Sequence, residues 1–422
     1  MTKNLPLSVE TVRPRLPADA FLKRHPLLNG AKSVERALRL TYGDAQPYMD
    51  QLKHDEVDAV RVLIALIFEP TAPELEFIED GIQATSDLLR ARAVEGNVFR
   101  DLDSQARALA GRTFKPTPRP LHVEPYSRVA IFSTEMDENR FARLLQSQAG
   151  IAVEIEELGG LPVRMAQIVA LVVCWPNCGT LRGLVERVLV ALDEALRDVD
   201  ARLYSVWIFA RGLPKSSPGT FVEVMLQLFN VGLIYVYGVN SGNVATPRSN
   251  DTFVFLADVS RATGIRVLLS GTCALLNHLS RQSAAADELL HKASLEISGY
   301  LPETARSVAS AYRDALPRLV RERLSLGTVT GLLERAGFQR RIYVQALTAV
   351  VEEILATGCA DAKEQYLVAD RVLGRRKGLL EAIGSASRGV TLSSNYRARY
   401  QEALPSSTKY LEEPKRIRRS KT

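Results

Sequence analysis

Short apolar runs alternate with amphipathic stretches through the middle of the chain. Four runs have the length and apolar character of buried strands, at residues 128–132, 167–175, 232–237 and 265–269. After each run, apolar residues recur at the three- and four-residue spacing of a helix, over residues 137–148, 180–196, 221–229 and 251–263. Strands that are apolar on both faces and alternate with helices are typical of a parallel sheet covered on both sides. The pattern therefore predicts an α/β core.

Helical patterns lie on both sides of this core. Residues 31–110 carry apolar stripes at helical spacing, and so do residues 298–387. Three prolines within residues 114–120 cannot continue a helix, so this segment is predicted to be an extended connector. We divide the chain into an N-terminal proline-containing and helical extension, an α/β core, a C-terminal helical region and a polar, basic tail. These parts are residues 1–120, 121–297, 298–387 and 388–422.

The positive charge of the chain is concentrated at its C-terminus. The 422 residues carry a formal charge of +6, from 54 Lys and Arg against 48 Asp and Glu. Five of the basic residues lie in the last eight positions, and without them the balance is 49 against 48. A nearly neutral body argues against a nucleic-acid-binding surface spread over it. Two basic clusters remain as candidate nucleic-acid contacts or as solvated faces, namely Arg371, Arg375, Arg376 and Lys377, and Lys415, Arg416, Arg418 and Arg419.

The composition predicts a cytoplasmic protein. Four cysteines in a chain of this length fit a reducing compartment. The N-terminus lacks the apolar stretch of a signal peptide. The most apolar long segment, residues 222–239, is interrupted by Glu223, Gln227 and Asn230. We therefore expect no membrane span.

The turn after the first strand lacks the residues of a nucleotide-binding loop. A P-loop needs glycines whose N–H groups wrap the phosphates, a Lys, and a Ser or Thr for magnesium. Residues 133–140 contain neither Gly nor Lys, and the acids Glu135, Asp137 and Glu138 would repel a triphosphate. The pattern GxxxxGK[ST] occurs nowhere in the chain. The end of the third strand, residues 236–240, also has no acid that could hold magnesium.

Other chemical motifs are weak. Cys174 and Cys178 form a CxxxC without the second pair of ligands that a structural zinc site needs. The five histidines are scattered, so no catalytic triad has a local signature. Residues 238–243 are rich in Gly and Asn, which is more typical of a flexible loop than of a phosphate-binding loop.

Three segments of the core have sequences that occur in the same order in a known protein family. Residues 167–176 read QIVALVVCWP, residues 232–240 read GLIYVYGVN, and residues 264–272 read GIRVLLSGT. This series resembles the strands "QIVxLxVxCP", "GLLVIDEIQ" and "GxPVVLIGT" of the TnsC/TniB family, the AAA+ ATPase regulators of transposons. The resemblance extends over roughly residues 20–380. It implies an AAA+-like parallel sheet flanked by helices, with an N-terminal helical extension and a C-terminal helical lid.

The residues that hydrolyse ATP in that family are missing from this chain. The resemblance places the degenerate Walker A positions at Ser133, Asn139 and Arg140, and the degenerate Walker B positions at Tyr237 and Gly238. Only the sensor-like hydroxyls of Ser270 and Thr272 are retained. The resemblance thus implies a site with no catalytic residue and no expected cofactor. ATP and magnesium would bind only if the degenerate site still holds them.

We therefore expect a non-hydrolysing accessory or regulatory subunit of a DNA transposition system, rather than an enzyme. The resemblance implies a TnsC-like ATPase, a transposase or a target selector as partner, together with DNA contact and oligomer formation. One alternative is an ATP-binding regulator in which Arg140 takes the place of the Walker Lys. Another is an unrelated α/β enzyme with a site at the carboxyl ends of the strands, built from Ser133, Asp137, Asn177, Tyr237 and Asn240. Side chains that fill this edge of the sheet would exclude the second alternative.

Overall fold

A computed structural model describes most of the core and of the C-terminal helices. The described residues are 28, 61, 64, 67–94, 123–132, 135–158, 161–199, 218–244, 248–281, 283–297, 299–388 and 400. Several sequence predictions lie outside them. They concern Ser133, the connector at 114–120, most of the N-terminal extension at 1–120, and the basic tail with Lys415, Arg416, Arg418 and Arg419.

The core is built on a parallel sheet of five strands. Along the sheet their order is β4 (Ala170–Cys174), β5 (Leu233–Val239), β6 (Arg266–Gly271), β1 (Ser127–Phe132) and β7 (Leu295–Ile297). Every pair of neighbours is parallel. The predicted parallel sheet is thus confirmed. Strand β7 was not predicted, because it is only three residues long and has Glu296 at its centre.

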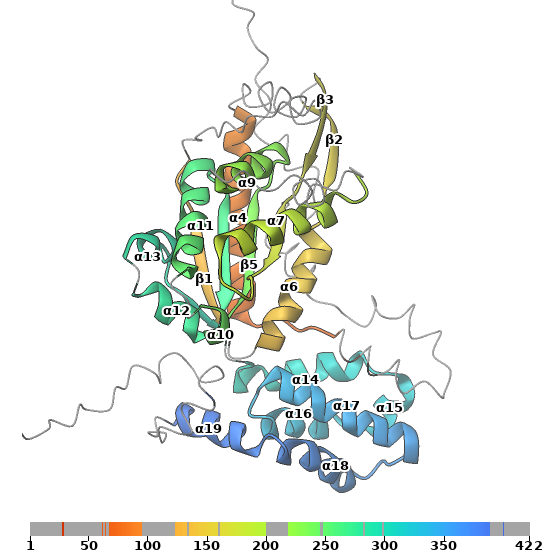
Figure 1. Cartoon of the computed structure of the whole chain (residues 1–422). Helices are drawn as coiled ribbons and strands as arrows, with labels where there is room; N and C mark the ends of the chain where they lie inside the picture. The colour runs from red at the N-terminus through yellow and green to blue at the C-terminus, as the bar shows by residue number, and fades with distance from the viewer. Residues whose placement is uncertain are drawn as a thin grey trace, which may run out of the picture.

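Helices cover both faces of the sheet, because successive residues of each strand point to opposite sides. On β6, Val267 and Leu269 pack into one apolar core while Leu268 packs into the other. The helices α7 (Leu181–Leu196), α9 (Pro218–Leu228), α11 (Ser249–Thr263), α12 (Cys273–Leu279) and α13 (Ser283–Leu289) lie on the first side. The helices α4 (Ala72–Val94) and α6 (Glu135–Ala149) lie on the second. Figure 1 shows α7, α9 and α11 in front of the strands and α4 behind them.

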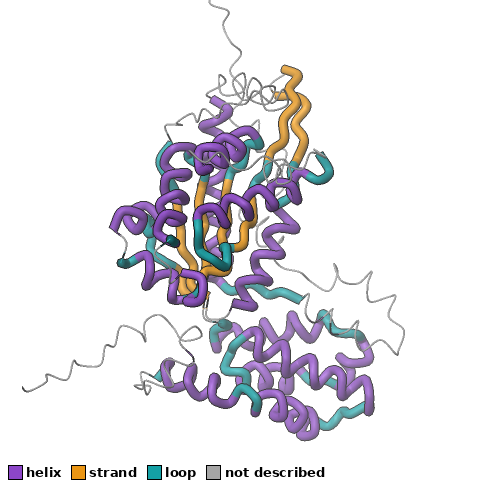
Figure 2. Tube along the Cα trace, in the orientation of Figure 1, coloured by secondary structure: helices purple, strands orange, loops and turns teal. Residues whose placement is uncertain are grey.

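A two-stranded antiparallel hairpin stands apart from the main sheet (Figure 2). It consists of β2 (Val153–Leu158) and β3 (Leu161–Gln167). The prediction of a single strand over 167–175 was wrong, because Gln167 ends β3 and Ala170 begins β4. Ile168 and Val169, which lie between the two strands, are both fully buried. The apolar pattern of the sequence therefore does not show where β3 ends and β4 begins.

The C-terminal helices form a second compact layer with an apolar core of its own. This layer comprises the 3₁₀ turn η2 (Pro302–Thr304) and the helices α14 (Ala305–Asp314), α15 (Arg318–Arg323), α16 (Leu326–Arg335), α17 (Arg340–Thr357), α18 (Ala362–Gly374) and α19 (Lys377–Ser387). Ser325 caps α16 through the N–H of Thr328, and Asp361 caps α18 through the N–H of Lys363. Figure 1 places this layer below the sheet. The predicted helical lid is therefore confirmed.

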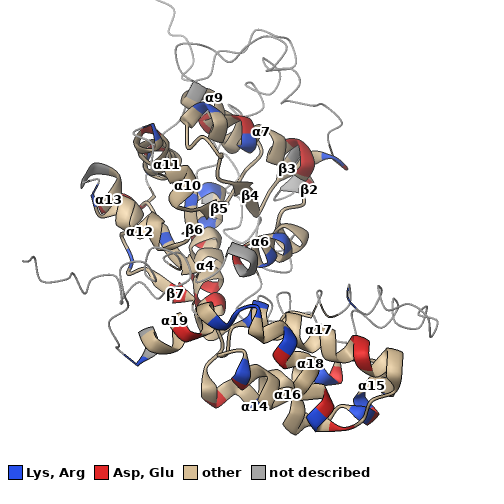
Figure 3. Ribbon diagram, turned by 60° about the horizontal axis from the view of Figure 1, so that its bottom comes forward, with Lys and Arg blue, Asp and Glu red and all other residues tan. Residues whose placement is uncertain are grey.

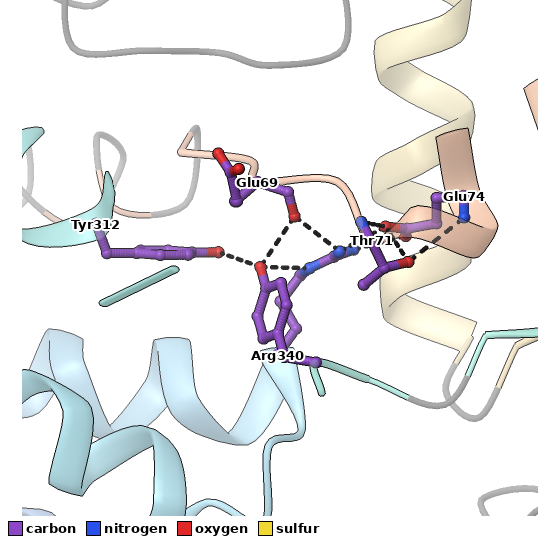
Figure 4. A network of polar contacts seen from close by, with 6 residues as sticks. Glu69, Thr71, Glu74, Tyr312 and Arg340 are labelled. Carbon is purple, nitrogen blue, oxygen red and sulfur yellow. Dashed lines mark hydrogen bonds and ion pairs between the residues drawn. The ribbon is translucent and has the colours of Figure 1, made fainter. Parts of the chain in front are cut away.

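A buried polar network joins the lid to the core (Figure 4). Arg340, at the start of α17, donates to both carboxylate oxygens of Glu74 on α4, at 2.8 and 2.6 Å. The Arg340 side chain also donates to the hydroxyl of Tyr300 and to the carbonyl of Glu69. Its guanidinium lies 4.3 Å from the centre of the Phe68 ring. Arg340 thus links the start of α17 to Glu74 in the first turn of α4 and to Glu69 just before it.

Candidate functional site

The carboxyl ends of three neighbouring strands meet the first turns of α6, where one carboxylate is completely buried. Glu138 has no solvent-exposed surface. Its Oε1 atom accepts a hydrogen bond of 2.8 Å from the N–H of Gly238, at the end of β5. The same oxygen accepts a second bond, of 2.6 Å, from the hydroxyl of Ser270 on β6. A side chain of the protein therefore supplies a negative group at this edge of the sheet.

The Ser270 hydroxyl also contacts the phenol of Tyr235, at 2.7 Å. Because a hydroxyl has one proton to give and that of Ser270 is directed at Glu138, the proton of the second bond comes from Tyr235. The three groups form a chain in which Tyr235 donates to Ser270 and Ser270 donates to Glu138. Burial, and secondly the charge of Glu138, hold the pKa of Tyr235 well above its usual range. The phenol is therefore fixed as a neutral donor.

An irregularity in β5 makes the backbone of Gly238 available to Glu138. The pairing of β5 with β6 shifts between Val236 and Val239, so the residues between them leave the regular ladder. Gly238 has a φ of +87°, in the left-handed region that favours glycine. Gly238, which the sequence resemblance assigns to Walker B, thus lies in a strand bulge, and its N–H group binds a carboxylate.

Asn240 organises the turn that follows β5. Its side-chain oxygen accepts hydrogen bonds from the N–H groups of Gly242 and Asn243, and the Asn243 side chain donates to the carbonyl of Gly238. Residues Ser241–Val244 form the short helix α10. The segment expected to be a flexible loop, 238–243, thus contains a turn closed by local amide hydrogen bonds and the start of α10.

Asn139 and Arg140, which the resemblance assigns to Walker A, lie on other sides of α6 than Glu138. Successive helix residues are rotated by about 100°, so Arg140 lies on nearly the opposite side of α6 from Glu138. The Arg140 guanidinium lies 5.5 Å from the ring centre of Phe68. Its Nη2 atom is buried without a hydrogen-bond partner among the described residues. Asn139 is exposed to solvent.

The sensor-like residues differ in their surroundings. Ser270 belongs to the network of Glu138, whereas the Thr272 hydroxyl is buried without a hydrogen-bond partner among the described residues. The Thr272 N–H donates to the carbonyl of Val239. A Cβ atom on the intervening Gly271 would lie 2.3 Å from that same carbonyl oxygen, so only glycine allows this close approach.

The residues of the expected enzyme site serve separate roles where they are described. Asn177 is exposed in the turn after β4, and Asn240 closes the turn before α10. Tyr237 is half-buried beside Cys174, and burial raises the pKa of both groups. The side chain of Asp137 lies outside the described residues, as does Ser133. The carboxylate that reaches the centre of this edge is Glu138.

The basic cluster of the lid lies at the junction of α18 and α19. Arg371, Arg375 and Lys377 are exposed, and Arg376 is half-buried. Lys377 lies 3.9 Å from a carboxylate oxygen of Glu381. Figure 3 shows basic and acidic segments interspersed along the lid helices. The cluster is thus accessible to a partner.

Two other kinds of site do not occur in the described part of the chain. It contains no group of three or more His, Cys, Asp or Glu side chains placed to share a metal ion. Nor does any of its helices combine the length and the apolar character needed to cross a membrane.

Comparison with known proteins gives only distant structural similarity. No protein-family model and no curated protein matches the chain. A solved structure of the ORC2 protein of Aeropyrum pernix, in ADPNP and ADP complexes, matches with 12% identity and a TM-score of 0.42, over 76% of this chain and 81% of that one. A Walker-type ATPase of Pyrococcus abyssi matches with 11% identity and a TM-score of 0.41, over 74% and 85%. The ORC1 protein of Aeropyrum pernix in complex with DNA matches with 16% identity and a TM-score of 0.36, over 73% and 76%.

The architecture of the chain itself defines the class of protein. A five-stranded parallel sheet lies between two layers of helices and is followed by a compact helical lid. This is an AAA+-like α/β fold, as the sequence predicts.

The sequence marks Glu138 as an acid that would repel a phosphate. It gives no sign that Glu138 accepts hydrogen bonds from Gly238 and Ser270. The position of this acid in an early turn of a helix that follows a strand is a usable signal, because helix N-termini favour negative groups.

Proposed function

We propose that the protein is a non-hydrolysing, AAA+-like accessory or regulatory subunit of a DNA transposition system. The observation that carries this proposal is the buried carboxylate of Glu138, held by Gly238 and Ser270 at the ends of β5 and β6. In an AAA+-like fold a phosphate group would need donors at this edge of the sheet. Here those donors already serve an internal anion.

Electrostatics support the loss of nucleotide turnover. Two negative groups close together in a poorly solvated site repel each other strongly, since water screens them less there. A phosphate would therefore have to displace the Glu138 side chain, or its binding would be weakened by electrostatic repulsion from the Glu138 carboxylate. The degenerate Walker B positions Tyr237 and Gly238 also offer no carboxylate to hold magnesium.

The transposition context rests on the resemblance of residues 167–176, 232–240 and 264–272 to the TnsC/TniB strands. We propose a TnsC-like ATPase, a transposase or a target selector as the protein partner. Oligomer formation and DNA contact are proposed from the same resemblance. A DNA contact made by lysine and arginine would weaken steeply as salt is raised, and a flat salt dependence would argue against it.

The proposal is tested by calorimetry with ATP and magnesium, at protein concentrations that detect millimolar binding. We expect no heat of binding and no competition with a labelled ATP analogue. Clear binding would overturn the non-nucleotide part of the proposal. Co-purification with a TnsC-like ATPase, a transposase or a target selector encoded beside this chain then tests the transposition part.

The second candidate is an ATP-binding regulator without the standard Walker residues. The observation that favours it is the buried Nη2 atom of Arg140, which has no hydrogen-bond partner among the described residues. Arginine can bind phosphate in place of lysine. In this case ATP would bind to the native protein, and the substitution Arg140→Met would abolish that binding while Asn139→Ala, on the exposed side of α6, would not.

A further inference from the structure

The lid carries an open groove between its last helices, on a part of the molecule remote from Glu138. The groove has a volume of about 720 Å³ and runs along α18 and α19. This volume lies within the range of sites that bind small ligands or the anchor residues of a peptide. Its apolar lining comes from Leu373 and Leu380, and two glycines, Gly374 and Gly384, widen it.

The two glycines leave space that a side chain would otherwise fill. A Cβ atom placed on either Gly374 or Gly384 would meet no other atom within 4 Å. Gly384 lies inside α19, where glycine costs about 0.5–1 kcal/mol relative to alanine. Packing against the described residues does not require this glycine. The absence of a side chain at Gly384 leaves the groove floor open toward them.

The rim of the groove carries a small excess of positive charge. Arg335, Lys377 and Arg388 line it, against the acids Asp370 and Glu381. Arg335 already binds Asp370, with distances of 2.7 and 2.8 Å to its two oxygens, and stacks on the Tyr366 ring at 4.2 Å. The last turn of α18 adds Arg371, and the turn after it adds Arg375 and Arg376; none of the three forms an ion pair with another described residue. The groove therefore combines an apolar floor with an excess of positive charge.

We propose that this groove binds an acidic, amphipathic helix of a partner protein. This inference rests on the proposed function, because it gives the regulatory subunit a surface for its protein partner. Leucine-like side chains of the partner helix would enter the space above Gly384, as apolar anchors do in helix-in-groove recognition. Its acidic residues would face Arg388 and the cations of the 371–377 turn, where charge complementarity sets the choice of partner.

Charge decides between this occupant and two others. The last eight residues of the chain, KRIRRSKT, carry five positive charges that the rim would repel. DNA would satisfy the cations but not the apolar floor of Leu373 and Leu380, because its outer surface is a row of phosphates. An acidic amphipathic helix satisfies both.

Fluorescence anisotropy with a labelled synthetic peptide tests the proposal on the full chain. The probe is a helical peptide with leucines on one face and glutamates elsewhere. The comparison ligands are the same peptide with serine for leucine, the same peptide with lysine for glutamate, and a labelled DNA duplex. The protein variants are Gly384→Leu, which fills the groove, and Arg388→Glu, which reverses one rim charge. The matched control is Arg306→Glu, an exposed arginine on α14 outside the groove.

We expect saturable binding of the leucine–glutamate peptide, weakened at least about tenfold by Gly384→Leu and by Arg388→Glu but unchanged by Arg306→Glu. The serine and lysine peptides should bind far more weakly. Three results would overturn the proposal: no saturable binding of the probe, equal binding of the serine peptide, or tight DNA binding that the same two variants abolish. Circular dichroism melts of each variant exclude unfolding as the cause of a loss.

The calorimetric test of ATP binding is independent of this one. ATP binding together with peptide binding would overturn the non-nucleotide part of the proposed function and leave the groove as a docking site. Absence of both would leave the proposed function and remove the groove.

Discussion

Arg340 and Glu74 form a two-point ion pair although 266 residues separate them in the sequence. Both side chains are almost fully buried, with 2% and 0% of their surface exposed. Thr71 completes the arrangement, because its N–H and its hydroxyl both donate to the second oxygen of Glu74. The lid is thus fixed to the first turn of α4 by charged groups that have no access to water.

Substitution of either partner alone should destabilise the protein strongly. Arg340→Met leaves the Glu74 carboxylate buried without its counter-ion, and the loss of one partner of a buried pair costs about 3–5 kcal/mol. The double variant Glu74→Met/Arg340→Met should recover most of this loss, because no buried charge remains. Urea titrations of the wild type, both single variants and the double variant measure the coupling.

The matched control for the ion pair is Arg182→Met. Arg182 pairs with Glu186 on the surface of α7, where 78% and 37% of the two side chains are exposed. Exposed pairs contribute little to stability, so this variant should unfold at the wild-type urea concentration. Equal effects of Arg340→Met and Arg182→Met would show that the Arg340–Glu74 pair does not hold the lid.

Removal of the Glu138 carboxylate should create a binding site for a small anion. Glu138→Ala leaves the Gly238 N–H and the Ser270 hydroxyl without their acceptor, at a cost of about 1–3 kcal/mol for an unsatisfied buried donor. Formate should restore part of the lost stability, because a ligand that binds only the folded state stabilises it. Thermal melts in formate and in chloride at equal ionic strength measure this. An equal response of Glu138→Ala and of the control Asn139→Ala would contradict the assignment.

Two glycine substitutions should change stability in opposite directions. Gly238→Ala forces a side chain into the left-handed region, at about 1–2 kcal/mol, and disturbs the N–H group that binds Glu138. Gly374→Ala, in α18 with no atom within 4 Å of the added Cβ, should be neutral or stabilise by up to about 1 kcal/mol. Guanidinium titrations compare the two variants, and a loss of equal size in both would rule out backbone conformation as the cause.

His278 should make the stability depend on pH near neutrality. Burial, and secondly the charge of Arg281, hold the pKa of His278 below its ordinary value of 6.5. The unfolded chain therefore takes up this proton first as the pH falls, and the folded state loses stability from about pH 6.5 down to the lowered pKa of His278. Above pH 6.5 this contribution is fully present.

The variant His278→Phe tests this dependence, because it keeps an aromatic ring beside Phe253, whose ring centre lies 5.2 Å from that of His278. Urea titrations on both sides of the ordinary histidine pKa should give a smaller difference for the variant than for the wild type. Identical differences would exclude His278 as the titrating group.

The parts of the fold that could be predicted are those fixed by local pattern. The helix expected at 180–196 is observed as α7, since Thr180 caps it and its apolar stripe is regular. The hairpin of β2 and β3 was missed, because its second strand continues into an apolar stretch that resembles the next strand. Periodicity shows which face of an element is buried, but it does not show where one apolar element ends and the next begins.

The sequence shows that Glu138 lies early in a helix that follows a strand. It does not show which residues Glu138 contacts. The bond between Glu138 and Gly238 spans 100 residues and depends on the bulge in β5, which no local pattern marks. The Arg340–Glu74 pair depends likewise on how the lid meets the core. The Walker and sensor assignments all remain predictions from the resemblance, namely those of Ser133, Asn139, Arg140, Tyr237, Gly238, Ser270 and Thr272.

The carboxylate at the strand ends is part of the same chain as the groups that bind it. Its local concentration is therefore constant, and neither dilution nor metabolic state can lower it. A free nucleotide would have to compete with the Glu138 carboxylate, which is already in place and loses no translational or rotational entropy on binding. The shape of the strand edge around Glu138 should thus be the same in a starved cell and in a growing one.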